Sequence, residues 1–259
     1  RLLAYMPRTK SENESVDWTK VRTYATNGIV EDFMINNTGD SGTWYNLFAS
    51  YINYPGWARA DMRIINMMDE SYPAHNPDGL DFTSPENSTT IKDARLLKDF
   101  DFVPSNAFRP ERGLYFFSNF RYNRYDAIHI DNFPSLGQSP MILKAENDLI
   151  LAEAELQLGN YSAAADIINS GTRILRGEMP EITTDPSEIS AAIHHERQIE
   201  LMSTSYGTAF FDMRKRDLLQ AGTPLEFPVP AKTLEVLQTP LPYYTTGGDN
   251  MSSSTGGWR

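Results

Sequence analysis

The strongest constraint on the fold of this chain is helical periodicity in two consecutive segments between Met141 and Gly177. In the first segment, apolar residues recur at spacings of three and four, which places them on one face of a helix. These residues are Ile142, Ala145, Leu149, Ala152 and Leu156. Gly159-Asn160-Tyr161 interrupts the pattern. A second helix then runs through Ala163, Ala164, Ile167, Ile168 and Ile174, so a helix–turn–helix pair is predicted.

Small alanines near the turn allow the two helices to approach closely, and Tyr161 fills the gap beside the turn, as in tetratricopeptide-like pairs. A partial pair is predicted at the start of the chain. Leu2–Tyr5 is expected to be helical, and Asp17 is a suitable N-cap for a helix that ends near Gly28. We therefore interpret residues 1–35 as the remnant of one pair and residues 141–240 as a helical part with a complete pair.

Residues 36–140 have a different character, because turn-forming residues interrupt them repeatedly. Examples are Asn37-Thr38-Gly39-Asp40, Tyr54-Pro55-Gly56 and Asn76-Pro77-Asp78-Gly79. One helix is predicted from Ala58 to Met68, and short strands are predicted at Tyr115–Phe117 and Tyr125–Ile130. A long helix is predicted to begin at Pro186, and Phe227-Pro228-Val229-Pro230 is expected to be extended. The fold class is mainly α, with long loops and a minor β component.

Composition excludes several classes of function. The 259 residues contain 23 Lys and Arg against 34 Asp and Glu, a net charge of −11 that disfavours a nucleic-acid partner. The absence of cysteine excludes disulfides, Cys-ligated metals and thiol nucleophiles. No apolar run approaches the ~18–20 residues of a membrane-spanning helix.

The two ends of the chain suggest a fragment of a longer protein. There is no initiator Met, and Arg1-Leu2-Leu3-Ala4-Tyr5-Met6 is typical of the end of a helix. Residues 241–259 are polar and rich in glycine and serine, so a flexible tail is expected there.

Three motifs occur in a fixed order in the second half of the chain. The first is Ala145-Glu146, then Leu149-Ile150 and Ala152-Glu153-Ala154, running into Gly159-Asn160-Tyr161 and Ala164. The second is His195-Glu196-Arg197-Gln198-Ile199-Glu200-Leu201, then Gly207, Phe210-Phe211-Asp212 and Arg214. The third is Phe227-Pro228-Val229-Pro230. Together they resemble the SusD/RagB family of outer-membrane glycan-binding lipoproteins.

The chain departs from the family pattern in several places. Two extra residues lie between Glu200-Leu201 and Gly207, and Ala209 stands where an arginine is common. The usual closing Gln-Asn-Pro-Gly is reduced to Gln238-Thr239-Pro240. The resemblance is therefore to a divergent branch.

The resemblance implies a SusD-like α-helical fold in which tetratricopeptide-like pairs support a loop-rich, ligand-binding region at residues 36–140. It implies a lipid anchor on the outer surface of the outer membrane and a SusC-like TonB-dependent transporter as partner. Oligosaccharides, or sometimes peptides, are the implied ligands. The family's lipidated N-terminal cysteine is absent, which agrees with a fragment that lacks its anchor.

An aromatic run in the loop-rich region is the candidate ligand site, because flat aromatic rings pack against the C–H faces of sugars. The candidate residues are Trp44, Tyr45, Tyr54 and Trp57. Phe48, Tyr51 and Ile52 are more simply interpreted as the inner face of a short helix. A second cluster from Tyr115 to Tyr125 is assigned to the core, with Arg121 and Arg124 pointing outward.

The charged residues of the first two motifs are interpreted as having a structural role. Glu146 and Glu153 lie seven apart on one helix face, and they are expected to pair with Arg197, Arg214 or Arg173. The structural family motif comprises Glu146, Glu153, Glu196, Arg197, Glu200, Asp212 and Arg214. A glycosidase would need two carboxyl groups across a cleft, which sequence spacing does not show.

No metal, cofactor or catalytic residue is predicted. His194-His195-Glu196 lacks the i, i+4 histidine pair of a helical zinc site. His129 with Asp131 is explained by a strand surface, and Asp99 with Asp101 lacks the remainder of a calcium loop.

The sequence thus predicts a non-enzymatic protein that binds glycans at the cell surface and passes them to the transporter. The alternative is a protein-interaction scaffold that contacts the transporter or binds peptides without binding glycan. A glycoside hydrolase or lyase is a third and weaker possibility.

Overall fold

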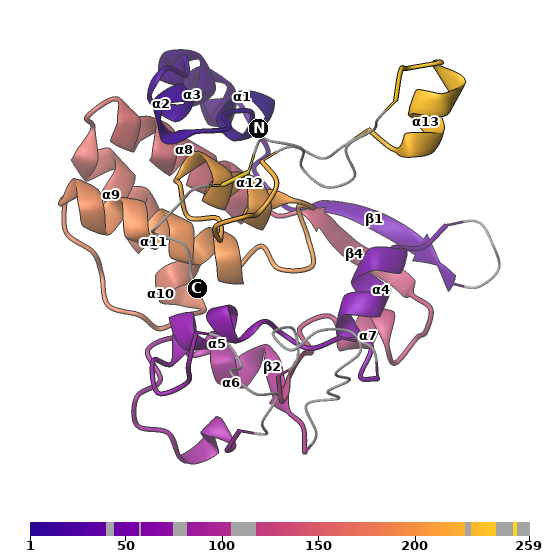
Figure 1. Ribbon diagram of the computed structural model, residues 1–259. Coiled ribbons are helices and arrows are strands. Elements are labelled where there is room, and N and C mark those ends of the chain that lie inside the picture. Colours follow the sequence, from indigo (N-terminus) through magenta and orange to yellow (C-terminus); the bar gives the residue numbers. More distant parts are fainter. Residues whose placement is uncertain are drawn as a thin grey trace. The chain divides into compact units, whose positions relative to one another are not determined.

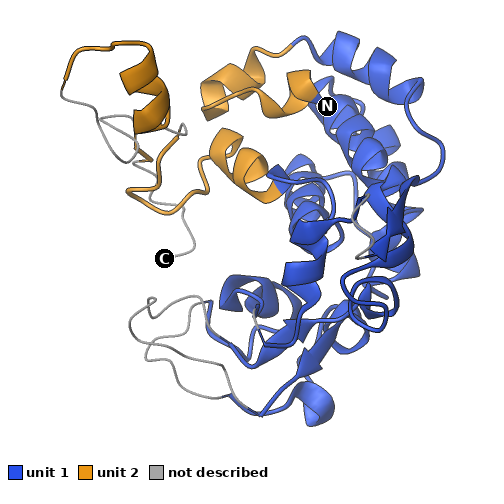
Figure 2. Cartoon of the chain, turned by 90° about the vertical axis from the view of Figure 1, so that its right-hand side faces the viewer, with its two compact units in different colours: residues 1, 17–208 blue, residues 2–16, 209–259 orange. Residues whose placement is uncertain are grey.

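The computed structural model describes residues 1–39, 44–56, 58–74, 82–104, 118–225, 229–241 and 251–252. This part is mainly helical, as predicted, with two small antiparallel sheets (Figure 1). The chain forms two compact units, one of residue 1 and residues 17–208 and the other of residues 2–16 and 209–259 (Figure 2). None of the described helices combines the length and the apolar character that a bilayer span requires.

The helical half of the larger unit contains the predicted pair. Its helices are α3 (Trp18–Thr26), α8 (Lys144–Gln157), α9 (Tyr161–Asn169), α10 (Thr172–Leu175) and α11 (Pro186–Ile199). α8, α9 and α11 share a core that includes Leu149, Ala152, Ala164, Ile168, Ile189 and Ile193. Asp17 caps α3 as predicted, since its carboxylate accepts the Lys20 N–H at 2.9 Å.

The loop-rich half of the larger unit carries both sheets. β1 (Phe33–Thr38) pairs with β4 (Leu136–Ile142), and β2 (Phe100–Phe102) pairs with β3 (Phe120–Tyr122). Short helices surround them: α4 (Leu47–Asn53), α5 (Met62–Met68), the 3-10 turn η2 (Pro85–Asn87), α6 (Arg95–Lys98) and α7 (Asp126–His129). Met62, Ile65, Met68, Leu96, Phe120 and Tyr122 form its core.

Two predicted boundaries differ from the structure. The pair begins at Lys144, because Met141 and Ile142 belong to β4 and pair toward Phe33. The helix predicted from Ala58 begins only at Met62, where Asp61 accepts the Arg63 N–H and caps it.

The predicted strand at Tyr125–Ile130 is wrong, because this segment contains helix α7. The His129 N–H donates to the Tyr125 carbonyl at 3.0 Å, and the two rings lie on the same side of the turn. The predicted strand at Tyr115–Phe117 lies outside the described residues.

Arg121 and Arg124 do not point outward, contrary to the prediction. Arg121 is buried, and it forms ion pairs with Asp101 and Asp126. Arg124 forms an ion pair with buried Glu200 at 2.8 Å. Ion pairs with acidic partners, Asp126 only five residues from Arg121 and Glu200 76 residues from Arg124, accompany the inward orientation of both cations.

The smaller unit contains α1 (Leu2–Tyr5), α2 (Lys10–Glu14), most of α12 (Thr208–Lys215) and α13 (Ala231–Val236). Buried Lys215 donates to the Ala4 carbonyl at 2.8 Å, and Arg214 donates to the Leu225 carbonyl at 2.9 Å. Asp212 pairs with Arg216 at 2.8 Å. Of the extended segment predicted at Phe227–Pro230, Phe227 and Pro228 lie outside the described residues.

Candidate functional site

Helix α4 is amphipathic in the reverse sense: its apolar side faces solvent and its polar side is buried. Leu47, Phe48 and Tyr51 are 51%, 53% and 42% exposed, whereas Ser50 and Asn53 are 1% and 0% exposed. The interpretation of Phe48 and Tyr51 as an inner face is therefore wrong. Ile52 differs from them, because it is half-buried and packs against the core.

Hydrogen bonds from neutral groups hold the inner side of α4. The N-cap residue Asn46 accepts the Ala49 N–H at 3.1 Å, and its own N–H donates to the Asn37 side chain at 2.9 Å. The Ser50 hydroxyl lies 2.6 Å from the Ser135 hydroxyl and 2.6 Å from the Pro134 carbonyl oxygen. These bonds explain why a helix with so few apolar inner residues docks against the ribbon of β1 and β4.

Hydrogen bonds also hold the C-terminal end of α4. The Asn53 side-chain amide donates to the Ala49 carbonyl at 2.7 Å and to the Ser203 hydroxyl at 3.3 Å. The Asn53 backbone carbonyl accepts from Arg121 at 2.9 Å. A cation near the last carbonyls of a helix also interacts favourably with the negative end of the helix dipole.

His129 extends this buried polar contact surface. Its Nδ1 lies 2.7 Å from the Ser135 hydroxyl, and its side chain is buried beneath the loop that follows α7. Burial lowers the pKa of His129 to about 4, so the ring is neutral near pH 7. We call Asn37, Asn46, Ser50, Asn53, His129, Ser135 and Ser203 the polar pad.

Aromatic side chains from two other segments contact α4 or Tyr54, the residue that follows it. Phe48 and Tyr206 form an edge-to-face pair with centroids 4.6 Å apart. The rings of Tyr54 and Phe133 have centroids 5.4 Å apart, and Phe133 is exposed. The Tyr206 hydroxyl donates to Asn46, which joins this group to the polar pad. We define the aromatic face as Trp44, Leu47, Phe48, Tyr51, Phe133 and Tyr206.

The four predicted ligand residues have different environments. Trp44 is exposed, and its backbone forms three hydrogen bonds with Thr38 of β1, at 2.9, 3.0 and 3.0 Å. Tyr45 is half-buried, and Tyr54 is half-buried against Phe133. Trp57 lies outside the described residues.

Sequence reasoning did not assign Phe133 or Tyr206 to this site. A signal existed for Tyr206, because it lies in the segment with two extra residues relative to the family pattern. That segment also contains Ser203, which supports α4.

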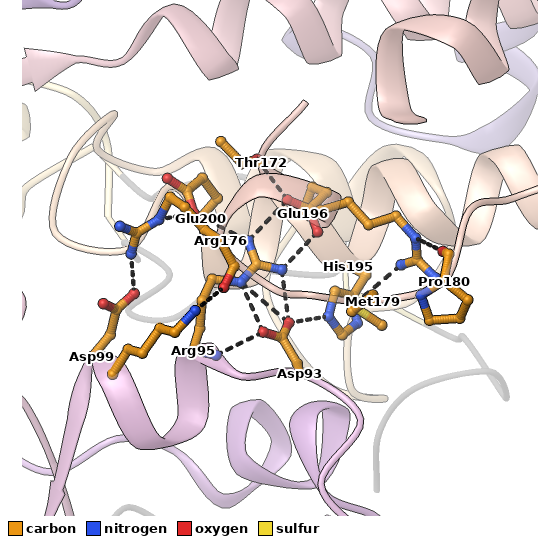
Figure 3. Close-up of polar contacts among 12 residues, drawn as sticks. Asp93, Arg95, Asp99, Thr172, Arg176, Met179, Pro180, His195, Glu196 and Glu200 are labelled. Carbon is orange, nitrogen blue, oxygen red and sulfur yellow. Dashed lines mark hydrogen bonds and ion pairs between the residues drawn. The ribbon is translucent and has the colours of Figure 1, made fainter. Parts of the chain in front are cut away.

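Glu196 and Glu200 of the second motif belong to a buried ion network centred on Arg95 (Figure 3). Arg95 pairs with Asp93 and Glu196 at 2.7 Å and with Glu200 at 3.0 Å. His195 contacts Asp93 at 2.8 Å. Burial by itself would raise the pKa of Asp93, but hydrogen bonds from His195 and Arg95 hold it well below its usual range. We call this the Arg95 network.

The network borders a cavity of about 320 Å³, lined in part by Thr172, Arg176, Glu196 and Glu200. Arg176 binds Glu200 at 3.1 Å and also pairs with Asp99, and Thr172 donates to Glu196 at 2.7 Å. Glu196 and Glu200 thus form ion pairs, an arrangement that is typical of a structural role.

The two glutamates of the first motif are also occupied. Glu153 accepts from Arg197 at 2.8 Å, which is one of the pairings expected from the sequence. Glu146 instead pairs with Arg1 at 2.7 Å and accepts from the Ser205 hydroxyl. The expected partners Arg173 and Arg214 donate to backbone carbonyls, of Pro180 and Leu225 respectively.

Within the described ranges, no group of three or more His, Asp or Glu side chains is arranged to hold a metal ion. Asp99 and Asp101, considered above for calcium, pair with Arg176 and Arg121 respectively.

No protein-family model and no curated protein sequence matches the chain. The solved structures similar to it include three SusD-like proteins. A SusD-like protein from Bacteroides fragilis matches with a TM-score of 0.47 and 19% identity, over 81% of this chain and 46% of that one. A SusD superfamily protein from the same species matches with a TM-score of 0.37 and 17% identity, over 74% and 42%.

The third is a SusD-like carbohydrate-binding protein from Bacteroides vulgatus, with a TM-score of 0.41 and 17% identity over 86% of this chain and 49% of that one. All three are named as SusD-like or SusD superfamily proteins, and the sequence motifs resemble that family. The chain spans less than half the length of each solved structure that it matches.

Proposed function

We propose that this chain binds glycans through the aromatic face and takes no part in their cleavage. The observation that supports this most is the reversed polarity of α4, which exposes Leu47, Phe48 and Tyr51 while polar residues are buried. Exposed apolar surface that the fold maintains at a cost is typical of a binding site. Flat rings offer stacking area to sugars with little loss of side-chain entropy.

The resemblance to the SusD/RagB family extends this proposal to the whole protein. In that setting residues 36–140 supply the ligand-binding region, and residues 141–240 supply the helical scaffold. The protein would be lipid-anchored at the outer surface of the outer membrane and would pass its ligand to a SusC-like TonB-dependent transporter. The engagement of Glu153, Glu196 and Glu200 in ion pairs supports a structural role for these carboxylates.

The test is isothermal titration against a panel of polysaccharides, with Tyr51→Ala, Phe48→Ala and Trp44→Ala as variants. Removing one stacking ring is expected to weaken binding by about tenfold, or ~1.4 kcal/mol. Tyr24→Ala is a matched control, because Tyr24 is an exposed tyrosine on α3, away from the aromatic face. Unchanged affinity in all three variants would reject this site.

The scaffold alternative has a separate readout. A stable complex with the transporter, together with no binding of any polysaccharide, would favour a protein-interaction role.

Trp57→Ala is added to the variants used in the titration, because Trp57 is among the residues predicted to contact the ligand.

A further inference from the structure

Four of the six residues of the aromatic face lie in a part of the sequence that carries no formal charge. Residues 41–58 contain no Lys, Arg, His, Asp or Glu, in a chain in which 22% of residues are Asp, Glu, Lys or Arg. The other contributors come from segments without Lys or Arg, since none occurs in 125–143 around Phe133 or in 198–213 around Tyr206. Every side chain of the face is therefore neutral.

The described cations that lie nearest to α4 in the sequence, or that contact it, already form ion pairs or hydrogen bonds. Arg121 lies beneath the helix and binds Asp101, Asp126 and the Asn53 carbonyl. Arg59 donates to the carbonyls of Pro55 and Ala58. Asp131, two residues before Phe133, is exposed and adds a negative charge to that loop.

We propose that the aromatic face selects neutral glycans and discriminates against glycans that carry uronate or sulfate groups. This inference rests on the proposed function and adds its ligand class. An anionic sugar stacked on these rings would lose part of its hydration, and the side chains of the face include no cation that could replace it. The net charge of −11 would also repel it at low ionic strength.

The first experiment compares two groups of probes on the wild-type chain. Neutral probes are starch, xyloglucan and a mixed-linkage β-glucan, and acidic probes are polygalacturonate, alginate and heparan sulfate. At least one neutral probe is expected to bind about tenfold or more tightly than every acidic probe, with little dependence on salt. Equal or tighter binding of an acidic probe that Phe48→Ala abolishes would overturn the selectivity while leaving glycan binding at this face intact.

The second experiment adds a cation to the face. Leu47 is 51% exposed, so Leu47→Arg is tolerated by the fold, and Leu47→Gln is its neutral control. Leu47→Arg is expected to improve binding of an acidic probe by about tenfold at low salt, and high salt should remove the gain. An equal effect of Leu47→Gln would contradict the role of charge. Failure of every probe of both classes to bind would reject the proposed function together with this inference.

Discussion

The Arg95 network and the polar pad are both buried, but they stabilise their surroundings with different chemistry. The network joins α6 and α11 through full charges, with three carboxylates around one guanidinium. The pad holds α4 with amides, hydroxyls and a neutral imidazole. The polar groups of the network bind one another, whereas the polar groups of the pad hold one side of α4 so that its apolar side faces solvent. Buried polar groups therefore have a structural role in both regions, and the exposed surface above the pad is the site that we propose for ligand binding.

The largest effect is expected from breaking the network at its centre. Arg95→Met leaves Asp93, Glu196 and Glu200 buried without their common cation, and it is expected to lower the free energy of unfolding by about 3–5 kcal/mol. Urea denaturation followed by circular dichroism measures this loss.

The control for this variant is Lys92→Met, which breaks an exposed pair with Glu70. Its effect is expected to stay within about 0.5 kcal/mol, because surface ion pairs contribute little. Equal losses in the two variants would show that the network is not a distinct stabilising centre.

A smaller effect is expected when the pad is broken. Ser50→Ala removes the hydroxyl that contacts Pro134, Ser135 and Asn46, at an expected cost of about 1–3 kcal/mol. The loss should be local, so hydrogen exchange should accelerate mainly at the amides of α4. Ser170→Ala is the matched control, because its hydroxyl is exposed and bonds only within its own turn among the contacts described. Protection of α4 that is unchanged by Ser50→Ala would argue against the pad.

The third prediction separates the two regions by pH. The pKa of His129 is lowered by burial to about 4, against an ordinary value of ~6.5, so its neutral form stabilises the fold. This contribution is complete above pH ~6.5 and is lost as pH falls toward 4, with a slope of at most about 1.4 kcal/mol per pH unit. The charge of Asp126 opposes the lowering but does not overcome it.

The network responds at lower pH. The pKa of Asp93 is held below its ordinary value of ~3.9, so its contribution is present above that value and is lost only as pH falls further. Stability measured between pH 7 and 3 should therefore fall first with the pad and then with the network. His129→Gln should flatten the upper part of this profile, and an unaltered slope between pH 6.5 and 4 would contradict the assignment.

Several elements of the fold could be predicted because their signals are local. The spacing of Leu149, Ala152 and Leu156 predicted α8, and Asp17 was identified as the cap of α3. The pairing of Glu153 with Arg197 was also among those expected. The mistaken side-chain orientations come from two assumptions, that apolar residues of a short helix turn inward and that arginines turn outward.

The helix pair, the mainly α class, the family resemblance and the uncharged aromatic segment around Trp44 could be read from the sequence alone. These features follow from periodicity, capping and composition, which depend on residues close together in the chain. That α4 buries Ser50 and Asn53 and exposes Phe48 and Tyr51 could be seen only in the folded structure. The reason is that its hydrogen-bond partners, such as Ser135 and Ser203, lie 85 and 150 residues away in the chain, and burial of α4's polar side is favourable only where folding brings them together.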